Sequence, residues 1–125
     1  MDPLDGIWRL IESRAWDEQN RLSAPYGRHP IGQISFANGR TLAALCNGDH
    51  DVGAKGARSD SSYGGPYTFD GSTLETQVDI ASDPARIGSR QIRGVVITGE
   101  QMLLRPPRRL YAGKLERRAL VWERA

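Results

Sequence analysis

The segment Ile31-Gly-Gln-Ile-Ser-Phe-Ala-Asn-Gly-Arg-Thr-Leu-Ala-Ala-Leu-Cys46 decides the fold class of this chain. Asn38-Gly39 is the strongest short signal for a tight β-hairpin turn, because both residues accept positive φ angles. The strands expected on either side of it, residues 31–37 and 40–46, must therefore pair antiparallel. Asp70-Gly71 is a second turn of this kind. Both turns predict antiparallel β-structure.

Turn signals recur about every eight to twelve residues along the rest of the chain, and helical periodicity is nearly absent. This spacing is typical of an all-β barrel or sandwich. Because short hairpins join most of the strands, we expect about eight of them in an up-and-down order, closed into a barrel. Such a barrel has no free sheet edges, and its interior is filled by side chains or holds one small ligand. Further strands are expected at residues 6–14, 66–70, 73–80, 89–97, 101–105 and 115–123.

Residues 47–64 are the least strand-like part of the chain, because glycines are scattered among polar and charged residues there. A loop of this length in a compact domain is usually a lid, a binding loop or disordered. We expect a mobile loop or lid that borders the barrel mouth. A short helix over residues 52–61 is an alternative, although the glycine content argues against it.

The composition fits one small globular domain spanning residues 1–125. The chain is 38% hydrophobic and 26% charged, which excludes a disordered chain and a helical membrane protein. No apolar run approaches the roughly 20 residues that span a bilayer. The start of the chain, residues 1–6, is acidic and lacks the features of a secretory signal. We therefore expect a cytoplasmic protein, with a processed secreted form as the alternative.

Cysteine, histidine and charge limit the kinds of partner. Cys46 is the single cysteine, so no internal disulfide is expected, and with His29 and His50 as the only histidines a metal site has few ligands. The formal net charge is +2. An arginine-rich stretch over residues 105–118 is interpreted as a solvated loop and an exposed strand face, with RNA binding as a remote alternative. We expect a monomer or homodimer without nucleic-acid or membrane partners.

A family resemblance rests on motifs near both ends of the chain. Gly6-Ile7-Trp8 is similar to the G-x-W signature of the calycin superfamily, and residues 121–124 read Val-Trp-Glu-Arg. With Pro30-Ile31-Gly32, Asn38-Gly39-Arg40 and Tyr63-Gly-Gly-Pro-Tyr67 between them, they resemble the lipocalin-like domain family of small bacterial and fungal barrels. The resemblance spans nearly the whole chain. It implies a lipocalin-like barrel with a central ligand cavity open at one end, and an Arg124 that lies across Trp8 in a cation–π contact.

One departure from the family limits what can be transferred. Many members carry a His-His pair in the strand after the Asp-Gly turn, whereas this chain reads Thr76-Gln77. A function that depended on those imidazoles is therefore absent here.

Two charged residues are candidates for the interior: Glu12 from strand alternation, and Arg93 because the family resemblance implies an arginine at its position. If Trp8 faces inward, Glu12 lies on the same side, where burial would raise its pKa and make it a general acid or base. The alternative is a rim position or a bulge that leaves Glu12 in solvent. Arg93 either points into the cavity, where it could pair with Glu12 or clamp a ligand carboxylate, or lies outside.

Aromatic and histidine side chains complete the candidate set. His50, between Asp49 and Asp51, is a possible base, with an exposed loop histidine as the alternative. Tyr67 could orient a ligand carbonyl through its hydroxyl, and packing in the core explains it equally well. The residues expected to line the ligand cavity are Tyr63, Phe36, Leu42, Trp122, Tyr111 and His29.

Two functions remain open at this point. The first is a cofactor-independent isomerase, cyclase or lyase that moves a proton next to a carbonyl of a hydrophobic or aromatic metabolite. In it Glu12 or His50 would be the base, and Arg93 with a tyrosine would stabilise the oxyanion. The second is a binding or carrier barrel without catalysis. Phosphate-cradling, dinucleotide-binding and nucleophile-elbow motifs are missing from the sequence, so neither function is expected to use such a cofactor.

Overall fold

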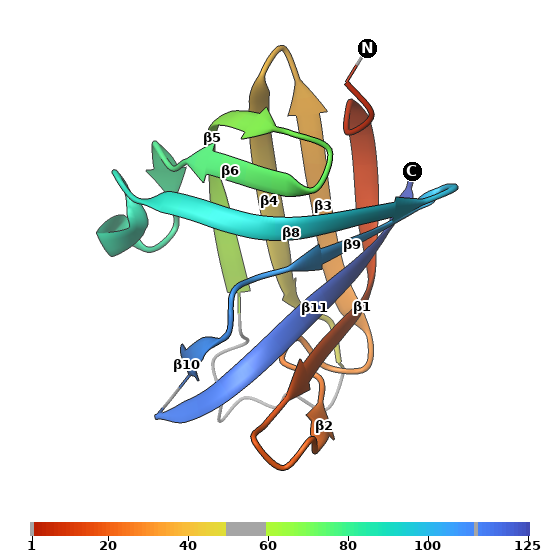
Figure 1. The fold of residues 1–125 in the computed structure, drawn as a ribbon, viewed down its shortest axis with the longest axis vertical. Coiled ribbons are helices and arrows are strands. Elements are labelled where there is room, and N and C mark those ends of the chain that lie inside the picture. Colours follow the sequence, from red (N-terminus) through yellow and green to blue (C-terminus); the bar gives the residue numbers. More distant parts are fainter. Residues whose placement is uncertain (1, 50–59, 112) are drawn as a thin grey trace.

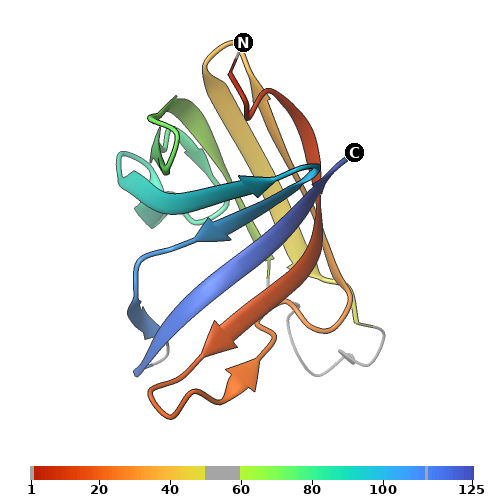
Figure 2. The same cartoon turned by 45° about the vertical axis from the view of Figure 1, so that its right-hand side comes forward.

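Eight strands close into an antiparallel β-barrel, which confirms the predicted fold class (Figure 1, Figure 2). The computed structural model describes residues 2–49, 60–111 and 113–125. Each barrel strand pairs with the next one along the chain, and β11 pairs with β1 to close the ring. The barrel strands are β1 (Gly6–Trp16), β3 (Pro30–Ala37), β4 (Arg40–Asn47), β5 (Asp60–Phe69), β6 (Thr73–Gln77), β8 (Arg90–Thr98), β9 (Gln101–Arg105) and β11 (Lys114–Arg124).

In the part of the chain that the structure describes, four short elements lie outside this ring. β2 (Leu22–Ser23) pairs with β1, β7 (Ile80–Ala81) pairs with β5, and β10 (Arg109–Tyr111) pairs with β11. A single 3-10 turn, η1 (Pro84–Arg86), precedes β8. None of the helical segments in the described ranges is long and apolar enough to cross a membrane.

The Asn38-Gly39 hairpin forms as predicted. Asn38 has a φ of 53° and Gly39 a φ of 75°, the left-handed values that this tight turn requires. The flanking strands β3 and β4 pair along their whole lengths, from Ala37 opposite Arg40 to Pro30 opposite Asn47.

The strand after the glycine-rich segment begins earlier than predicted. Residues 60–64 belong to β5 and pair with β4 from Asp60 opposite Cys46 onward, so the expected loop is wrong for these residues. The pairing continues through Gly64 and Gly65, which are buried. A Cβ atom on Gly65 would overlap the carbonyl oxygen of Gln77, so glycine is needed where β5 passes that chain segment. Asn47 also belongs to a strand, β4, and not to the expected loop. The rest of the expected lid and of the alternative helix falls mainly on residues 50–59, outside the described residues.

One end of the barrel is closed by Trp8 and Arg124, as the family resemblance implies. Trp8 is fully buried and donates its Nε1–H to the carbonyl of Leu4 at 2.9 Å. The Arg124 guanidinium lies 4.1 Å from the centre of the Trp8 ring and donates to the carbonyls of Asp5 and Pro3, at 2.9 and 2.7 Å. Because β1 and β11 are the first and last strands, these contacts hold both ends of the chain together.

Candidate functional site

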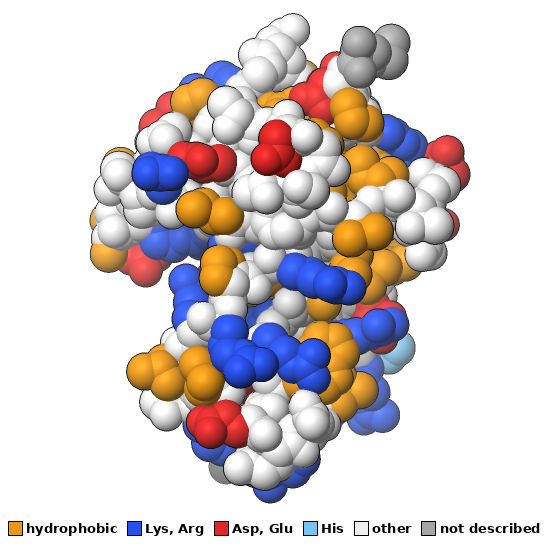
Figure 3. Space-filling view, viewed as in Figure 1, with side chains coloured by type: hydrophobic (Ala, Val, Ile, Leu, Met, Phe, Trp, Pro, Cys, Tyr) orange, Lys and Arg blue, Asp and Glu red, His pale blue; other side chains and the backbone are white. Residues whose placement is uncertain are grey.

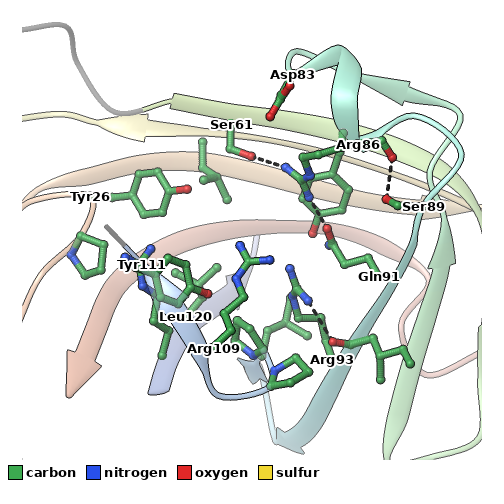
Figure 4. Close-up of a pocket in the computed structure, with 18 of the residues that line it drawn as sticks. Tyr26, Ser61, Asp83, Arg86, Ser89, Gln91, Arg93, Arg109, Tyr111 and Leu120 are labelled. Atoms are coloured by element: carbon green, nitrogen blue, oxygen red, sulfur yellow. Dashed lines mark hydrogen bonds between the residues drawn. The ribbon is translucent and has the colours of Figure 1, made fainter. Parts of the chain in front are cut away.

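A pocket of about 580 Å³ lies toward the other end of β11 from Arg124. Its walls come from β1, β4, β5, β8, β9 and β11, together with η1, β10 and the segment before β3 (Figure 4). Figure 3 shows Arg and Lys side chains gathered around a hollow near the link between β9 and β10. The lining residues that matter below are Tyr26, Leu45, Ser61, Tyr63, Asp83, Arg86, Gln91, Arg93, Leu104, Arg109, Tyr111, Arg118 and Leu120, and we call this site the arginine pocket.

Strand alternation explains why two of its arginines face inward. On β8 the side chains of Gln91 and Val95 are buried, and Arg93 lies between them on the same face. On β11, counting back by two residues from the buried Trp122 reaches Leu120 and then Arg118 on the same face. Arg86 and Arg109 reach the pocket from η1 and β10 instead.

Arg86 is held in place by neutral groups. Its Nη1 donates to the Ser61 Oγ at 2.9 Å, and its Nη2 donates to the Gln91 Oε1. The guanidinium also lies over the Tyr63 ring, 4.6 Å from the ring centre. None of these partners carries a charge, so the position of Arg86 is fixed while its positive charge is not neutralised.

Tyr111 lies against two guanidinium groups. Arg118 is 3.4 Å and Arg109 is 4.7 Å from the centre of its ring. Arg118 also donates to the Glu116 carboxylate at 3.0 Å, which balances its charge. Its buried Nε–H has no hydrogen-bond acceptor among the described residues. The β10–β11 hairpin therefore brings an aromatic face and two cations to one wall of the pocket.

Arg93 is a partly buried cation, and this burial makes its positive charge unfavourable. Its Nη1 donates to the carbonyl of Ile92 at 2.9 Å, and no carboxylate within the described ranges lies within ion-pair distance of it. Burial lowers the pKa of the Arg93 guanidinium, and the nearby cations Arg109 and Arg86 lower it further, while Tyr63 and Tyr111 act in the opposite direction. An anion in the pocket would compensate this cost.

Burial also acts on the tyrosine hydroxyl at the pocket mouth. It raises the pKa of Tyr26, whose backbone N–H is anchored to the Ser13 Oγ at 3.1 Å. Tyr26 is therefore a neutral phenol at physiological pH and can donate a hydrogen bond.

Glu12 does not face the interior, and the alternative, a bulge that leaves its side chain in solvent, is confirmed. The register between β1 and β11 shifts between Leu10 and Glu12, a β-bulge that reverses the alternation begun at Trp8. Ser13 is buried in its place, and the exposed Glu12 carboxylate accepts a hydrogen bond at 2.7 Å from Arg14, whose side chain reaches the edge of the pocket. This hydrogen bond holds the pKa of Glu12 below its usual value, contrary to the expected rise.

Three of the predicted site residues do not line the arginine pocket: Tyr67, Phe36 and Trp122. The Tyr67 hydroxyl donates to the Asp2 carboxylate at 2.6 Å, and its ring packs edge-on against Phe36 with the ring centres 5.2 Å apart. Burial, and then the hydrogen bond to Asp2, raise the pKa of Tyr67. Phe36 and Trp122 are core residues. Their side chains stabilise the barrel and do not line the arginine pocket.

The other predicted residues divide between the pocket and the surface. Arg93, Tyr63 and Tyr111 line the pocket, as expected. Leu42 is 51% exposed on the outer face of β4, so its predicted place in the cavity is wrong. His29 is exposed, and its backbone N–H donates to the Asp49 carboxylate at 2.8 Å. His50 lies outside the described residues.

Sequence reasoning missed Tyr26, Arg86, Arg109 and Arg118 as pocket residues. Arg118 could have been found, since counting by twos from the inward Trp122 reaches it. Arg109 and Arg118 were instead assigned to a solvated basic stretch. Arg86 and Tyr26 come from a turn and an irregular segment, where no periodic pattern indicates the direction of a side chain.

The chemistry that the pocket offers is anion binding and hydrogen-bond donation. Asp83 is its one carboxylate among the described lining residues, and its Oδ1 accepts from the backbone N–H of Ala85 at 3.0 Å, as a cap of η1. Three or more His, Cys, Asp or Glu side chains do not gather as metal ligands anywhere in the described ranges.

Comparison with known proteins supports the fold alone. No protein-family model and no curated protein matches the sequence. A similar solved structure is the crystal structure of an uncharacterized protein from Bacteroides eggerthii, with 14% sequence identity and a TM-score of 0.51. The match covers 98% of this chain and 99% of that one. At this identity, the neighbour shows that such a barrel occurs as a whole chain elsewhere and carries no functional information.

Proposed function

We propose that the protein binds a small organic anion, with an acidic group and an apolar body, in the arginine pocket. The observation that carries this proposal is the presence of Arg93 and Arg109 in the lining without a carboxylate partner in the part of the chain that the structure describes. Guanidinium groups bind carboxylates through paired hydrogen bonds, with fixed geometry. A ligand anion would supply the missing negative charge.

The rest of the lining suits the body of such a ligand. Leu45, Leu104 and Leu120 contribute apolar surface, and the tyrosine rings add flat aromatic faces. A volume of about 580 Å³ is in the range of pockets that hold a small organic molecule. A bare inorganic anion would leave most of that space empty.

Binding is favoured over catalysis because the described lining residues include no suitable base. A proton-transfer enzyme needs a group that accepts the proton close to the ligand. Glu12 lies outside the barrel, and Asp83 is engaged in capping η1. An isomerase, cyclase or lyase activity would depend on His50, so it stays a prediction.

Membership of the lipocalin-like domain family is part of the same proposal. It is supported by the eight-stranded closed barrel and by the Trp8–Arg124 contact between the first and last strands. Ligand binding inside one end of a barrel is what this resemblance implies.

Isothermal titration calorimetry with a matched pair of compounds tests the proposal. We expect 2-naphthoate to bind and 2-naphthamide, which has the same body without the charge, to bind at least about tenfold more weakly. Arg93→Gln should abolish this preference. Arg105→Gln is the matched control, because Arg105 is exposed on β9 and does not line the pocket. Equal affinity for both compounds, or no binding of either, would contradict the proposal.

A further inference from the structure

We propose that the ligand of the arginine pocket is a dicarboxylate, with two acidic groups carried at separate positions on one apolar frame. This inference rests on the proposed function and specifies its ligand. It follows from the charge balance of the lining, from the positions of the three uncompensated guanidinium groups, and from the surface between them.

Counted over the described lining residues, the pocket has an excess of two positive charges. Three lining arginines have their own carboxylates: Arg14 pairs with Glu12, Arg90 with Glu75 and Arg118 with Glu116.

The remaining charged groups in the described lining are Arg86, Arg93, Arg109 and Asp83. Three positive charges and one negative charge leave +2, so a monoanion would neutralise only half of the excess. A dianion would leave these described groups neutral, which favours it most at Arg86 and Arg93, the two that are partly buried.

The three arginines reach the pocket from two sides. Arg93 and Arg109 extend toward one space from β8 and β10, and Arg86 approaches it from η1 (Figure 4). Arg93 uses one N–H for the Ile92 carbonyl, and no side-chain hydrogen bond of Arg109 is found within the described residues. Together they present several free donors to one carboxylate.

Arg86 provides the second position. Its contacts with Ser61, Gln91 and the Tyr63 ring fix the guanidinium while leaving other N–H groups free. A preorganised donor loses little conformational freedom when an anion binds. A second carboxylate at Arg86 would therefore add affinity.

The surface between these positions favours separated acids over a compact dianion. Leucine side chains and tyrosine rings form walls of the same pocket, and they match the carbon frame that would join two carboxylates. A phosphate monoester concentrates both charges on one group. It would satisfy Arg93 and Arg109 and leave Arg86 without an anion.

Calorimetric titration of the wild-type protein with three compounds tests the inference. The compounds are naphthalene-2,6-dicarboxylate, 2-naphthoate and 2-naphthyl phosphate, which share one aromatic body. We expect the dicarboxylate to bind about tenfold or more tightly than the monocarboxylate, the gain of one additional charge-assisted contact. We expect the phosphate to bind more weakly than the dicarboxylate.

Variants assign the two positions. Arg86→Gln should weaken the dicarboxylate clearly more than 2-naphthoate, and so remove the advantage of the dicarboxylate. Arg93→Gln should weaken both ligands, and Arg105→Gln should change neither. Because Arg86 also contacts β5 and β8, thermal unfolding must show that Arg86→Gln is folded. The wild-type series decides the inference even if that variant does not fold.

The outcomes separate this inference from the proposed function. If 2-naphthoate and the dicarboxylate bind equally well, the dicarboxylate inference is wrong and anion binding stands. If the phosphate binds most tightly, the ligand is a compact dianion and the inference is again wrong. If none of the three compounds binds, the proposed function itself fails.

Discussion

Replacing Arg124 with methionine should destabilise the barrel by about 2–4 kcal/mol. Arg124 makes one cation–π contact, 4.1 Å from the Trp8 ring centre, which contributes about 0.5–2 kcal/mol. Its two hydrogen bonds to the carbonyls of Pro3 and Asp5 should add about 0.75–1 kcal/mol each, below the usual range for a charged donor, because this end is partly exposed. Methionine keeps an apolar chain over the ring and loses all three contacts.

Urea unfolding followed by tryptophan fluorescence measures this loss. For a domain of this size, the expected change corresponds to a fall in Tm of roughly 10 °C. Arg124→Lys should be intermediate, because a single ammonium cannot cover the ring and reach both carbonyls. Arg105→Met, at an exposed position on β9, should stay within about 0.5 kcal/mol of wild type. If Arg124→Met also stayed within that margin, Trp8 and Arg124 would not close the barrel in the way described.

Three further predictions concern other parts of the chain. Arg93→Met should stabilise the ligand-free protein by about 0.5–1.5 kcal/mol in urea unfolding, because it removes an uncompensated half-buried cation and loses only one hydrogen bond. A fall in the free energy of unfolding by more than about 1 kcal/mol would be inconsistent with this view. The raised pKa of Tyr67 favours the folded state below the unfolded-state pKa of about 10, and this contribution is lost as the pH rises through the folded-state pKa. The urea midpoint of wild type should therefore fall more steeply above about pH 10 than that of Tyr67→Phe, and equal slopes would argue against the Asp2 contact. Gly65→Ala should cost at least about 2 kcal/mol through overlap with the Gln77 carbonyl, whereas Gly94→Ala, whose new Cβ would meet Arg105 at 3.8 Å, should cost less than about 0.5 kcal/mol.

The fold could be predicted because its main signals are local. Asn38-Gly39 requires positive φ angles that few other pairs accept, so it fixed the β3–β4 hairpin before any long-range contact was known. The Trp8–Arg124 contact was predictable from the family resemblance, although the two residues lie at opposite ends of the chain. Residues 60–64 were assigned to a loop because the glycines and serines there have low strand propensity. Pairing with β4 overrides that propensity.

The site was harder to predict, because its residues depend on one bulge and on irregular segments. Alternation from Trp8 holds only to Leu10, and a one-residue shift then exchanges Glu12 for Ser13 on the inner face. No feature of the sequence around Ile11 marks that bulge. Arg93 was singled out from the family resemblance, and the uninterrupted alternation of β8 places it on the inner face. Arg118 lies on the inner face of β11 in the same way. Arg86 enters from a turn that periodicity cannot orient.

The most direct test of anion binding is a crystal structure of the protein with 6-bromo-2-naphthoate, in which anomalous scattering locates the bromine. The account predicts one bromine peak inside the arginine pocket, beside Leu104 and Leu120, with the carboxylate within hydrogen-bond distance of Arg93 and Arg109. A ligand bound on the outer face of the barrel, or in the pocket with its carboxylate turned away from these arginines, would contradict it.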